Sequence, residues 1–209
     1  VAMTGDLIQD GNRAAYDRFR ELMTTLQLPV YCVPGNHDVR EFMRDVVSAA
    51  PFHYCDSVHI NNWLITGIDS CIDGKADGRI DDAELERLAG ILAKSAAEHV
   101  MVCLHHPPLP VGSRWLDTVG LQNSEDFLRL VARAGNVRAA IFGHIHQPFE
   151  GQYEGISIIG TPSTCRQFTA GSDEFSLDDN PPAYRRLSLH ADGSIEHELV
   201  WLSADSSQE

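Results

Sequence analysis

Four short motifs combine glycine or proline with residues that bind divalent metal ions. They are Gly5-Asp6, Gly35-Asn36-His37-Asp38, His105-His106-Pro107-Pro108 and Gly143-His144-Ile145-His146. Imidazole nitrogens suit Fe, Mn or Zn, a carboxylate can bridge two cations, and an amide oxygen adds a neutral ligand. Together the motifs predict a metal-dependent hydrolysis of a phosphoester, in which the cations offset the negative charge of the phosphate.

Each motif follows an apolar segment that is typical of a buried strand. The four segments are residues 1–3, 30–33, 100–104 and 139–142. Continuous apolar runs occur in strands that are covered on both faces, so we expect these four strands to lie side by side. Because ligands gather where the strands of such sheets end, the four motifs should meet at one edge.

Helices and further strands are predicted between and after the motifs. The expected helices are residues 14–26, a segment that starts at a capping box of Asp81 and Glu84, and residues 124–134, which end at Gly135-Asn136. A hairpin is expected over residues 58–69, with residues 67–70 near the rim of the site. After His146, strands at 156–159, 184–190 and 195–201 predict a second, more antiparallel sheet.

The order of the four motifs resembles the calcineurin-like metallophosphoesterase superfamily, over nearly the whole chain. Flanking segments resemble, within it, the bacterial class III 3',5'-cyclic AMP phosphodiesterases; these segments are residues 113–117, 121–123, 143–147, 161–165 and 189–193. The resemblance implies an α/β fold, a four-layer α/β/β/α sandwich of two mixed sheets flanked by helices. We expect one catalytic domain over residues 1–202 and a frayed tail at 203–209.

The resemblance also implies two metal sites that share one carboxylate. The ligands of one metal would be Asp6, Asn36, His105 and His144. Asp6 would bridge to the other metal, which His146 would hold together with an Asp and a His from an Asp-x-His motif upstream of Gly-Asp. The sequence starts at Val1 without that motif. We therefore expect an N-terminally truncated copy of a longer protein, and the alternative is a natural variant that lacks one metal.

The expected cofactors are two divalent metal ions, with Fe or Mn favoured and Zn as the alternative. Water between two such ions has its pKa lowered toward about 7, so the nucleophile is a metal-bound hydroxide and needs no side chain. His37 is the predicted catalytic residue, a donor to the leaving ribose 3'-oxygen. The residues expected to face the substrate are Asp6, Asn36, His37 and His146. The predicted reaction converts 3',5'-cyclic AMP to 5'-AMP.

Several residues near the motifs have two possible roles on the basis of the sequence. One member of the His105-His106 pair is expected to bind metal directly, and His105 is favoured. Asp38 would orient the loop or an imidazole. Trp115 and Asp117 belong either to a lid that meets the nucleotide or to an ordered loop.

Composition narrows the partners and the setting. The formal net charge of −14 argues against a nucleic-acid surface, which needs clustered Lys and Arg. Five cysteines without a Cys-x-x-Cys pair favour buried free thiols in the cytoplasm. No apolar run is long enough for a membrane span, so the expected partner is a small cyclic nucleotide, with neither nucleic acid nor membrane. The oligomeric state stays open.

Other functions remain possible on sequence grounds alone. Glycerophosphodiesters, 2',3'-cyclic nucleotides and phosphomonoesters are alternative substrates, because the metals recognise phosphate and the sequence contains no clear base-reading pocket. A different class of function is a metal-binding fragment with little or no turnover, which the loss of one ligand pair would produce.

Overall fold

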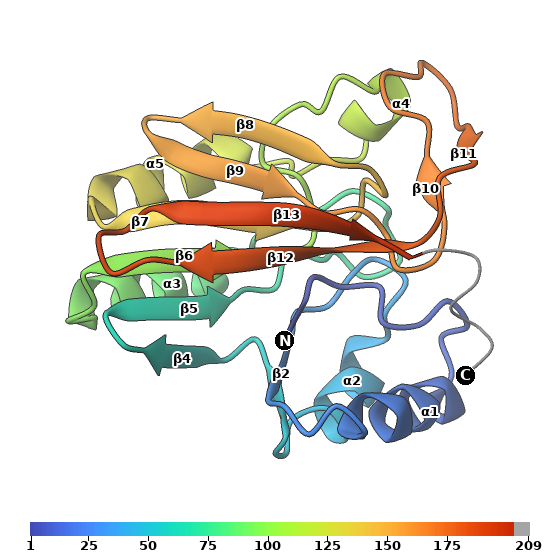
Figure 1. Cartoon of the computed structure of the whole chain (residues 1–209), viewed down its shortest axis with the longest axis horizontal. Helices are drawn as coiled ribbons and strands as arrows, with labels where there is room; N and C mark the ends of the chain where they lie inside the picture. Colours follow the sequence, from blue (N-terminus) through green and yellow to red (C-terminus); the bar gives the residue numbers. More distant parts are fainter. Residues whose placement is uncertain (203–209) are drawn as a thin grey trace.

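The computed structural model describes residues 1–202 and arranges them in four layers (Figure 1). Two helices cover the outer face of a six-stranded sheet, and the inner face of that sheet packs on a second layer of strands. Two further helices cover the second layer. This order confirms the α/β/β/α sandwich that the family resemblance implies.

The larger sheet has a parallel centre and antiparallel edges. Its strands, in spatial order, are β4 (Ser57–Ile60), β5 (Trp63–Gly67), β6 (His99–Cys103), β7 (Val137–Phe142), β9 (Ile156–Gly160) and β8 (Phe149–Tyr153). The pairs β5–β6, β6–β7 and β7–β9 are parallel, whereas β4 and β8 run antiparallel to their neighbours. Helices α3 (Asp82–Lys94) and α5 (Ser124–Ala134) bury an apolar core against this sheet.

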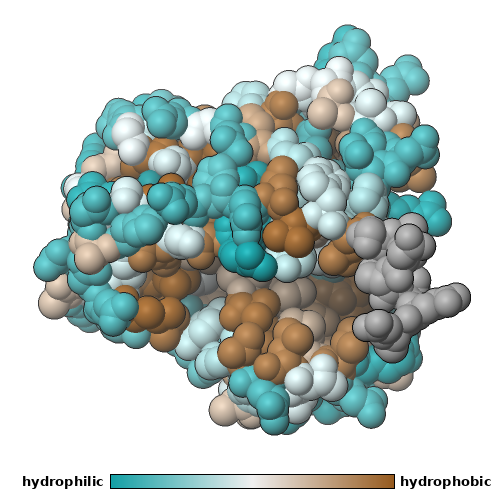
Figure 2. All heavy atoms as spheres, viewed as in Figure 1, coloured by the Kyte–Doolittle hydropathy of each residue, from teal (hydrophilic) through white to brown (hydrophobic). Residues whose placement is uncertain are grey.

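The second layer contains a small parallel sheet and a hairpin. The parallel sheet consists of β1 (Ala2–Met3), β2 (Val30–Cys32) and β3 (Phe52–Tyr54), and the hairpin of β12 (Ala183–Leu189) and β13 (Ile195–Trp201). Leu187, Leu189 and Ile195 of the hairpin pack on the inner face of the larger sheet. Helices α1 (Arg13–Thr24) and α2 (Arg40–Val46) cover the small sheet. Figure 2, in the same view as Figure 1, shows apolar side chains around a hollow between the β12–β13 hairpin and helices α1 and α2.

The predicted helices are confirmed, and their ends have local causes. The side chain of Asn12 accepts a hydrogen bond from the N–H of Ala15 and starts α1. Asp81 caps α3 by accepting from the N–H of Glu84, but the Glu84 carboxylate accepts from the N–H of Asp69. Only half of the predicted capping box therefore forms. Gly135 ends α5 in the left-handed conformation, with φ of 74°.

Two expectations about the sheets were wrong. The strands before the four motifs do not lie side by side, because β1 and β2 pair in the small sheet and β6 and β7 in the larger one. An apolar run shows that a strand is buried but does not specify its partner. The predicted strand at 156–159 is β9, which joins the larger sheet rather than the antiparallel unit of β12 and β13. The hairpin predicted over residues 58–69 is confirmed as β4–β5.

Three short elements complete the fold near the ends of the central strands. They are α4 (Arg114–Asp117), β10 (Gln167–Phe168) and β11 (Leu177–Asp178), which lie together in Figure 1. None of the helices within residues 1–202 has the length and apolar character needed to cross a membrane. The tail predicted at 203–209 lies outside the described residues.

Candidate metal centre

The four sequence motifs meet where the two layers of strands face each other. Gly5-Asp6 follows β1 and residues 35–38 follow β2, whereas His105-His106 follows β6 and residues 143–146 follow β7. Loops that follow parallel strands lie at the same end of a sheet. The packing of one sheet on the other therefore brings both pairs of loops together, and the motifs converge across two sheets instead of along one edge.

Three of the predicted ligands form a tight group around the amide of Asn36. Asn36 Oδ1 lies 3.1 Å from His105 Nε2 and 2.9 Å from His144 Nδ1, and these two ring nitrogens are 3.2 Å apart. Asp6 Oδ2 is 3.4 Å from His105 Nε2. Two loops from each sheet thus direct polar atoms at one common point.

The hydrogen bonding of His105 shows that this group fits a cation. His105 Nδ1 is 2.7 Å from the carbonyl oxygen of Thr4, which can only accept, so Nδ1 carries the proton. In the neutral ring Nε2 then has a lone pair, and it faces the oxygens of Asn36 and Asp6. Burial opposes a charge on His105, but Asp6 raises the pKa of its ring, so the three atoms face a position that attracts positive charge. This donor set suits Fe, Mn or Zn.

The charge states of the group agree with metal binding. Burial would raise the pKa of Asp6, but the charge and hydrogen bond of His105, with the N–H of His37 donating at 2.9 Å, hold the pKa of Asp6 well below its usual range. Burial lowers the pKa of His144 to about 3 and also lowers the pKa of His146. Near pH 7 the site therefore combines an ionised carboxylate with neutral imidazoles at His144 and His146, the forms that bind metal ions. Burial opposes protonation of His105, but the charge of Asp6 raises the pKa of its ring.

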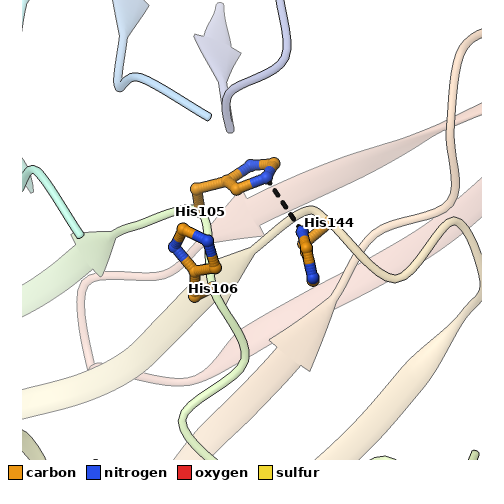
Figure 3. Close-up of side chains that lie close together, drawn as sticks. All are labelled: His105, His106 and His144. Atoms are coloured by element: carbon orange, nitrogen blue, oxygen red, sulfur yellow. Dashed lines mark hydrogen bonds between the residues drawn. The ribbon is translucent and has the colours of Figure 1, made fainter. Parts of the chain in front are cut away.

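His106 lies beside His105 and His144 (Figure 3), but its hydrogen-bond partner lies outside this group. Nitrogens of His105, His106 and His144 lie within 4.8 Å of one another. However, His106 Nδ1 is 2.9 Å from the hydroxyl oxygen of Ser70, and its Nε2 has no hydrogen-bond partner among the described residues. Burial lowers the pKa of His106 well below its usual value. His105 stays the predicted ligand, and His106 is the alternative.

The backbone after β7 differs from the extended segment expected from the Gly-His-x-His spacing. His144 and His146 have φ of 66° and 47°, in the left-handed region. The alternation of an extended strand therefore does not apply to this segment, and the expected reason for both rings to point together was wrong. His144 faces Asn36, whereas His146 has its Nδ1 2.9 Å from the carbonyl oxygen of Arg166 and its ring stacked on Phe168. The Nε2 atom of His146 remains available for a ligand.

His37 is exposed beside the group of ligands. Its backbone N–H donates to Asp6 Oδ1, and its Nδ1 lies 3.2 Å from the amide nitrogen of Gln9. Because an amide nitrogen donates, Nδ1 accepts, and the neutral ring carries its proton on Nε2. His37 therefore presents an N–H donor at the entrance of the site.

Two glycines allow the loops to approach this closely. A Cβ atom on Gly5, whose φ is +96°, would lie 2.3 Å from His105 Nδ1. A Cβ atom on Gly35 would lie 2.1 Å from Asp6 Oδ1. Asp6 itself has φ of 54°, which a residue with a side chain rarely adopts. The sequence motifs thus pair each glycine with the close contact that requires it.

Asp38 holds the two N-terminal loops together. Its Oδ2 atom accepts from the N–H groups of Gly35 and Leu7, at 2.9 and 3.2 Å. Its Oδ1 atom accepts from the hydroxyl of Tyr16 at 2.8 Å. Asp38 thus orients the loops of the site, which is one of the two roles that the sequence suggests for it.

Several groups that shape the site were missed in the sequence. The carbonyl oxygens of Thr4 and Arg166 orient His105 and His146. Every residue has a backbone carbonyl group, so residue types in the sequence do not indicate these contacts. Ser70 contacts His106, and the only signal was that residues 67–70 follow a strand near the rim. For the loop around α4, Asp117 accepts from the N–H groups at Val111 and Gly112, which favours the ordered-loop reading of Asp117. Trp115 packs against Phe168.

Comparisons with known proteins agree with this arrangement. Residues 1–148 match the model of calcineurin-like phosphoesterases. A 3',5'-cyclic adenosine monophosphate phosphodiesterase CpdA from Pseudomonas aeruginosa is 37% identical over 196 residues, which are 94% of this chain and 72% of the relative. CpdA from Escherichia coli K12 is 36% identical over 200 residues, which are 95% of this chain and 73% of the relative.

A solved structure supports the fold. The crystal structure of a dimetal phosphatase from Danio rerio superposes with a TM-score of 0.63 and covers 97% of this chain and 83% of its own. The sequence identity of that pair is 16%, so the likeness concerns the arrangement of the layers.

Proposed function

The chain belongs to the calcineurin-like metallophosphoesterase family, and on that premise we propose that it hydrolyses 3',5'-cyclic AMP to 5'-AMP. The observation that carries the proposal is the convergence of Asp6, Asn36 and His105, whose polar atoms face one common point. The relatives from Pseudomonas aeruginosa and Escherichia coli are named as 3',5'-cyclic AMP phosphodiesterases, and the choice of cyclic AMP as the proposed substrate rests on those names.

The metal ligands of the proposal come from all four loops. One ion would be held by Asp6, Asn36, His105 and His144. Asp6 would also bridge to a second ion, for which His146 offers its free Nε2. When bound, two such ions supply Lewis acidity that activates a water molecule and offsets charge on the phosphate oxygens. Fe or Mn is favoured and Zn is the alternative, because imidazole-rich sites disfavour Mg.

His37 is the proposed catalytic residue for the leaving group. Its Nε2–H is set by the contact of Nδ1 with Gln9, and its backbone is fixed by the hydrogen bond to Asp6. A departing ribose 3'-oxygen needs a proton or a strong hydrogen bond, which this donor provides. The substrate phosphate would lie between His37 and the side chains of Asp6, Asn36 and His146.

The cytoplasm is the proposed setting, and a small cyclic nucleotide is the proposed partner. All five cysteines are free; Cys32 and Cys103 are buried, whereas Cys165 is exposed, so the expectation of buried thiols was wrong for Cys165. Burial raises the pKa of the Cys32 and Cys103 thiols to about 12, so they are protonated and unreactive. Free thiols of this kind suit a reducing compartment.

A second candidate is a metal-binding chain with little turnover. The side chain of His146 contacts Arg166 and Phe168 rather than the group around Asn36. Within residues 1–202, the tight group of donors therefore surrounds one position, which favours a single tightly bound ion.

A substrate panel separates these candidates. The metal-loaded chain is incubated with 3',5'-cyclic AMP, 2',3'-cyclic AMP, a glycerophosphodiester and a phosphomonoester, and bound metal is measured by elemental analysis. We expect 3',5'-cyclic AMP to have the highest kcat/KM. A higher value for another ester would replace the proposed substrate. Tight metal binding without hydrolysis of any compound would establish the second candidate.

A further inference from the structure

Three aromatic side chains form a cluster beside the candidate metal centre. This aromatic cluster consists of Trp115 in α4, Phe168 in β10 and Phe175 in the loop before β11. Their ring centroids are 5.2 Å apart for Trp115–Phe168, 5.4 Å for Trp115–Phe175 and 5.4 Å for Phe168–Phe175. All three pairs are tilted at 66° to 80°, so the rings meet edge to face.

The aromatic cluster is joined directly to the site. The rings of His146 and Phe168 are parallel within 5°, with centroids 4.1 Å apart. The N–H of Phe168 also donates to the carbonyl oxygen of His146 at 2.9 Å. One face of Phe168 is therefore covered by a proposed metal ligand, and the same ring also contacts Phe175.

The loop that carries Phe175 is fixed by hydrogen bonds. The N–H of Gly171 donates to the hydroxyl oxygen of Ser113 at 2.9 Å, and Ser113 is fully buried. Thr169 donates its N–H to the carbonyl oxygen of Ser176 at 2.9 Å and its hydroxyl to that of Ser176 at 3.0 Å. The loop is thus tied both to the residue before α4 and across its own base.

Phe175 is nevertheless 61% exposed. A phenyl ring that is held in place by two aromatic neighbours, yet presents most of its surface to solvent, is preorganised to bind a flat apolar group. Phe168 and Trp115 are partly buried, so the free aromatic surface of the cluster belongs to Phe175. A ligand that lies with its phosphate at the metal centre would reach this ring with its other end.

We propose that Phe175 stacks on the purine base of the substrate and so selects cyclic purine nucleotides. The proposal rests on the proposed function, because it assumes that the phosphodiester lies beside Asp6 and His146. In a cyclic nucleotide the ribose joins phosphate and base. The ring centroids are 4.1 Å apart for His146–Phe168 and 5.4 Å apart for Phe168–Phe175, so only one aromatic ring separates Phe175 from the proposed metal ligand. Stacking depends on the area of the base, so it favours purines over pyrimidines without reading hydrogen bonds.

Kinetics on two cyclic phosphates test this role. The KM and kcat are measured for 3',5'-cyclic AMP and for ribose 3',5'-cyclic phosphate, which lacks the base. Wild type is compared with three variants. Phe175→Ala removes the ring, and Phe175→Tyr keeps a ring that can stack. Leu177→Ala removes an exposed apolar side chain from β11, next to the loop that carries Phe175. We expect Phe175→Ala to raise the KM for cyclic AMP about 5- to 100-fold, the scale of one lost base–aromatic stack. Phe175→Tyr and Leu177→Ala should keep the wild-type KM.

Two quantities decide the outcome: the KM for the substrate that lacks the base, and the affinity for the product 5'-AMP. If Phe175→Ala raises the KM for both substrates by the same factor, or leaves that for cyclic AMP unchanged, the base does not stack there and the proposal is overturned. Binding of 5'-AMP, measured by equilibrium dialysis, should weaken in Phe175→Ala even if wild type hydrolyses neither substrate. That pattern would reject the proposed function and retain the stacking role, whereas equal 5'-AMP affinity would reject the stacking role itself.

Discussion

The Nδ1–H group of His105 donates a hydrogen bond to the carbonyl oxygen of Thr4 at 2.7 Å. Thr4 follows β1 in the small sheet, and His105 follows β6 in the larger one. This single contact both connects the two layers and directs the lone pair of His105 Nε2 at the oxygens of Asn36 and Asp6. The tautomer of one imidazole is thus set by the packing of two sheets.

Asp6→Asn tests the proposed bridging ligand. The variant keeps the shape of the side chain but removes the charge that would hold two cations, so we expect kcat/KM for cyclic AMP to fall by more than about 100-fold, the upper end for groups that only orient ligands. Bound metal should fall as well, by elemental analysis. His59→Ala, which removes an exposed imidazole on the edge strand β4, is the control. Similar activity in both variants would remove Asp6 from the ligands.

His37→Ala tests the role of the leaving-group donor. We expect the rate on cyclic AMP to fall roughly 10²- to 10⁴-fold, the usual scale of general-acid catalysis. Bis-p-nitrophenyl phosphate should lose much less, because p-nitrophenolate departs without a proton. The comparison is made under single-turnover conditions, with metal content measured in parallel.

Two other results of that experiment would assign His37 differently. An equal loss with both esters would show that its imidazole acts on a step before departure of the leaving group. Loss of bound metal would instead make His37 a ligand or a support of Asp6.

Gly35→Ala tests the close approach of the two N-terminal loops. The added methyl group would lie 2.1 Å from Asp6 Oδ1, so the carboxylate must move and the affinity for Mn should fall. The matched control is Gly90→Ala in α3, where a Cβ atom meets nothing within 4 Å. In the control we expect unchanged Mn affinity and a gain of about 0.5 to 1 kcal/mol in the free energy of unfolding. Calorimetric titration with Mn that gives equal affinities would refute the steric argument.

Tyr16→Phe tests how much the hydrogen bonds of the Tyr16 hydroxyl group with Asp38 and Val39 stabilise the fold. The hydroxyl of Tyr16 donates to Asp38 Oδ1 and accepts from the N–H of Val39, both at 2.8 Å. Its loss removes a hydrogen bond to a partly buried carboxylate, so we expect the free energy of unfolding in urea to fall by about 1.5 to 3 kcal/mol. Tyr184→Phe, at an exposed position on β12, should change it by less than about 0.5 kcal/mol. Equal losses of unfolding free energy in the two variants would show that the hydrogen bonds of Tyr16 contribute little to stability.

The sequence predicts a structural feature correctly where the residues that determine it are neighbours along the chain. The helix at 124–134 matches α5 because its apolar spacing and the glycine at 135 are both contained in that segment. The motifs also identified Asn36, His105 and His144, which the structure brings together. In these cases a residue type and its neighbours along the chain determine the result.

Other features depend on contacts between distant segments. The placement of β9 beside β7 and the division of the four strands between two sheets follow from packing, which an apolar run does not encode. The orientation of His146 depends on a left-handed backbone and on the ring of Phe168. The aromatic surface of Phe175 arises only when α4 and the segment before β11 come together.

Metal removal and restoration tests the central claim most directly. The chain is freed of metal with a chelator, its metal content is checked, and hydrolysis of 3',5'-cyclic AMP is followed by chromatography before and after Mn, Fe or Mg is added. We predict no hydrolysis without metal, recovery with Mn or Fe, weaker recovery with Mg, and 5'-AMP as the product. Hydrolysis at the same rate in the metal-free chain, or 3'-AMP as the product, would contradict the account.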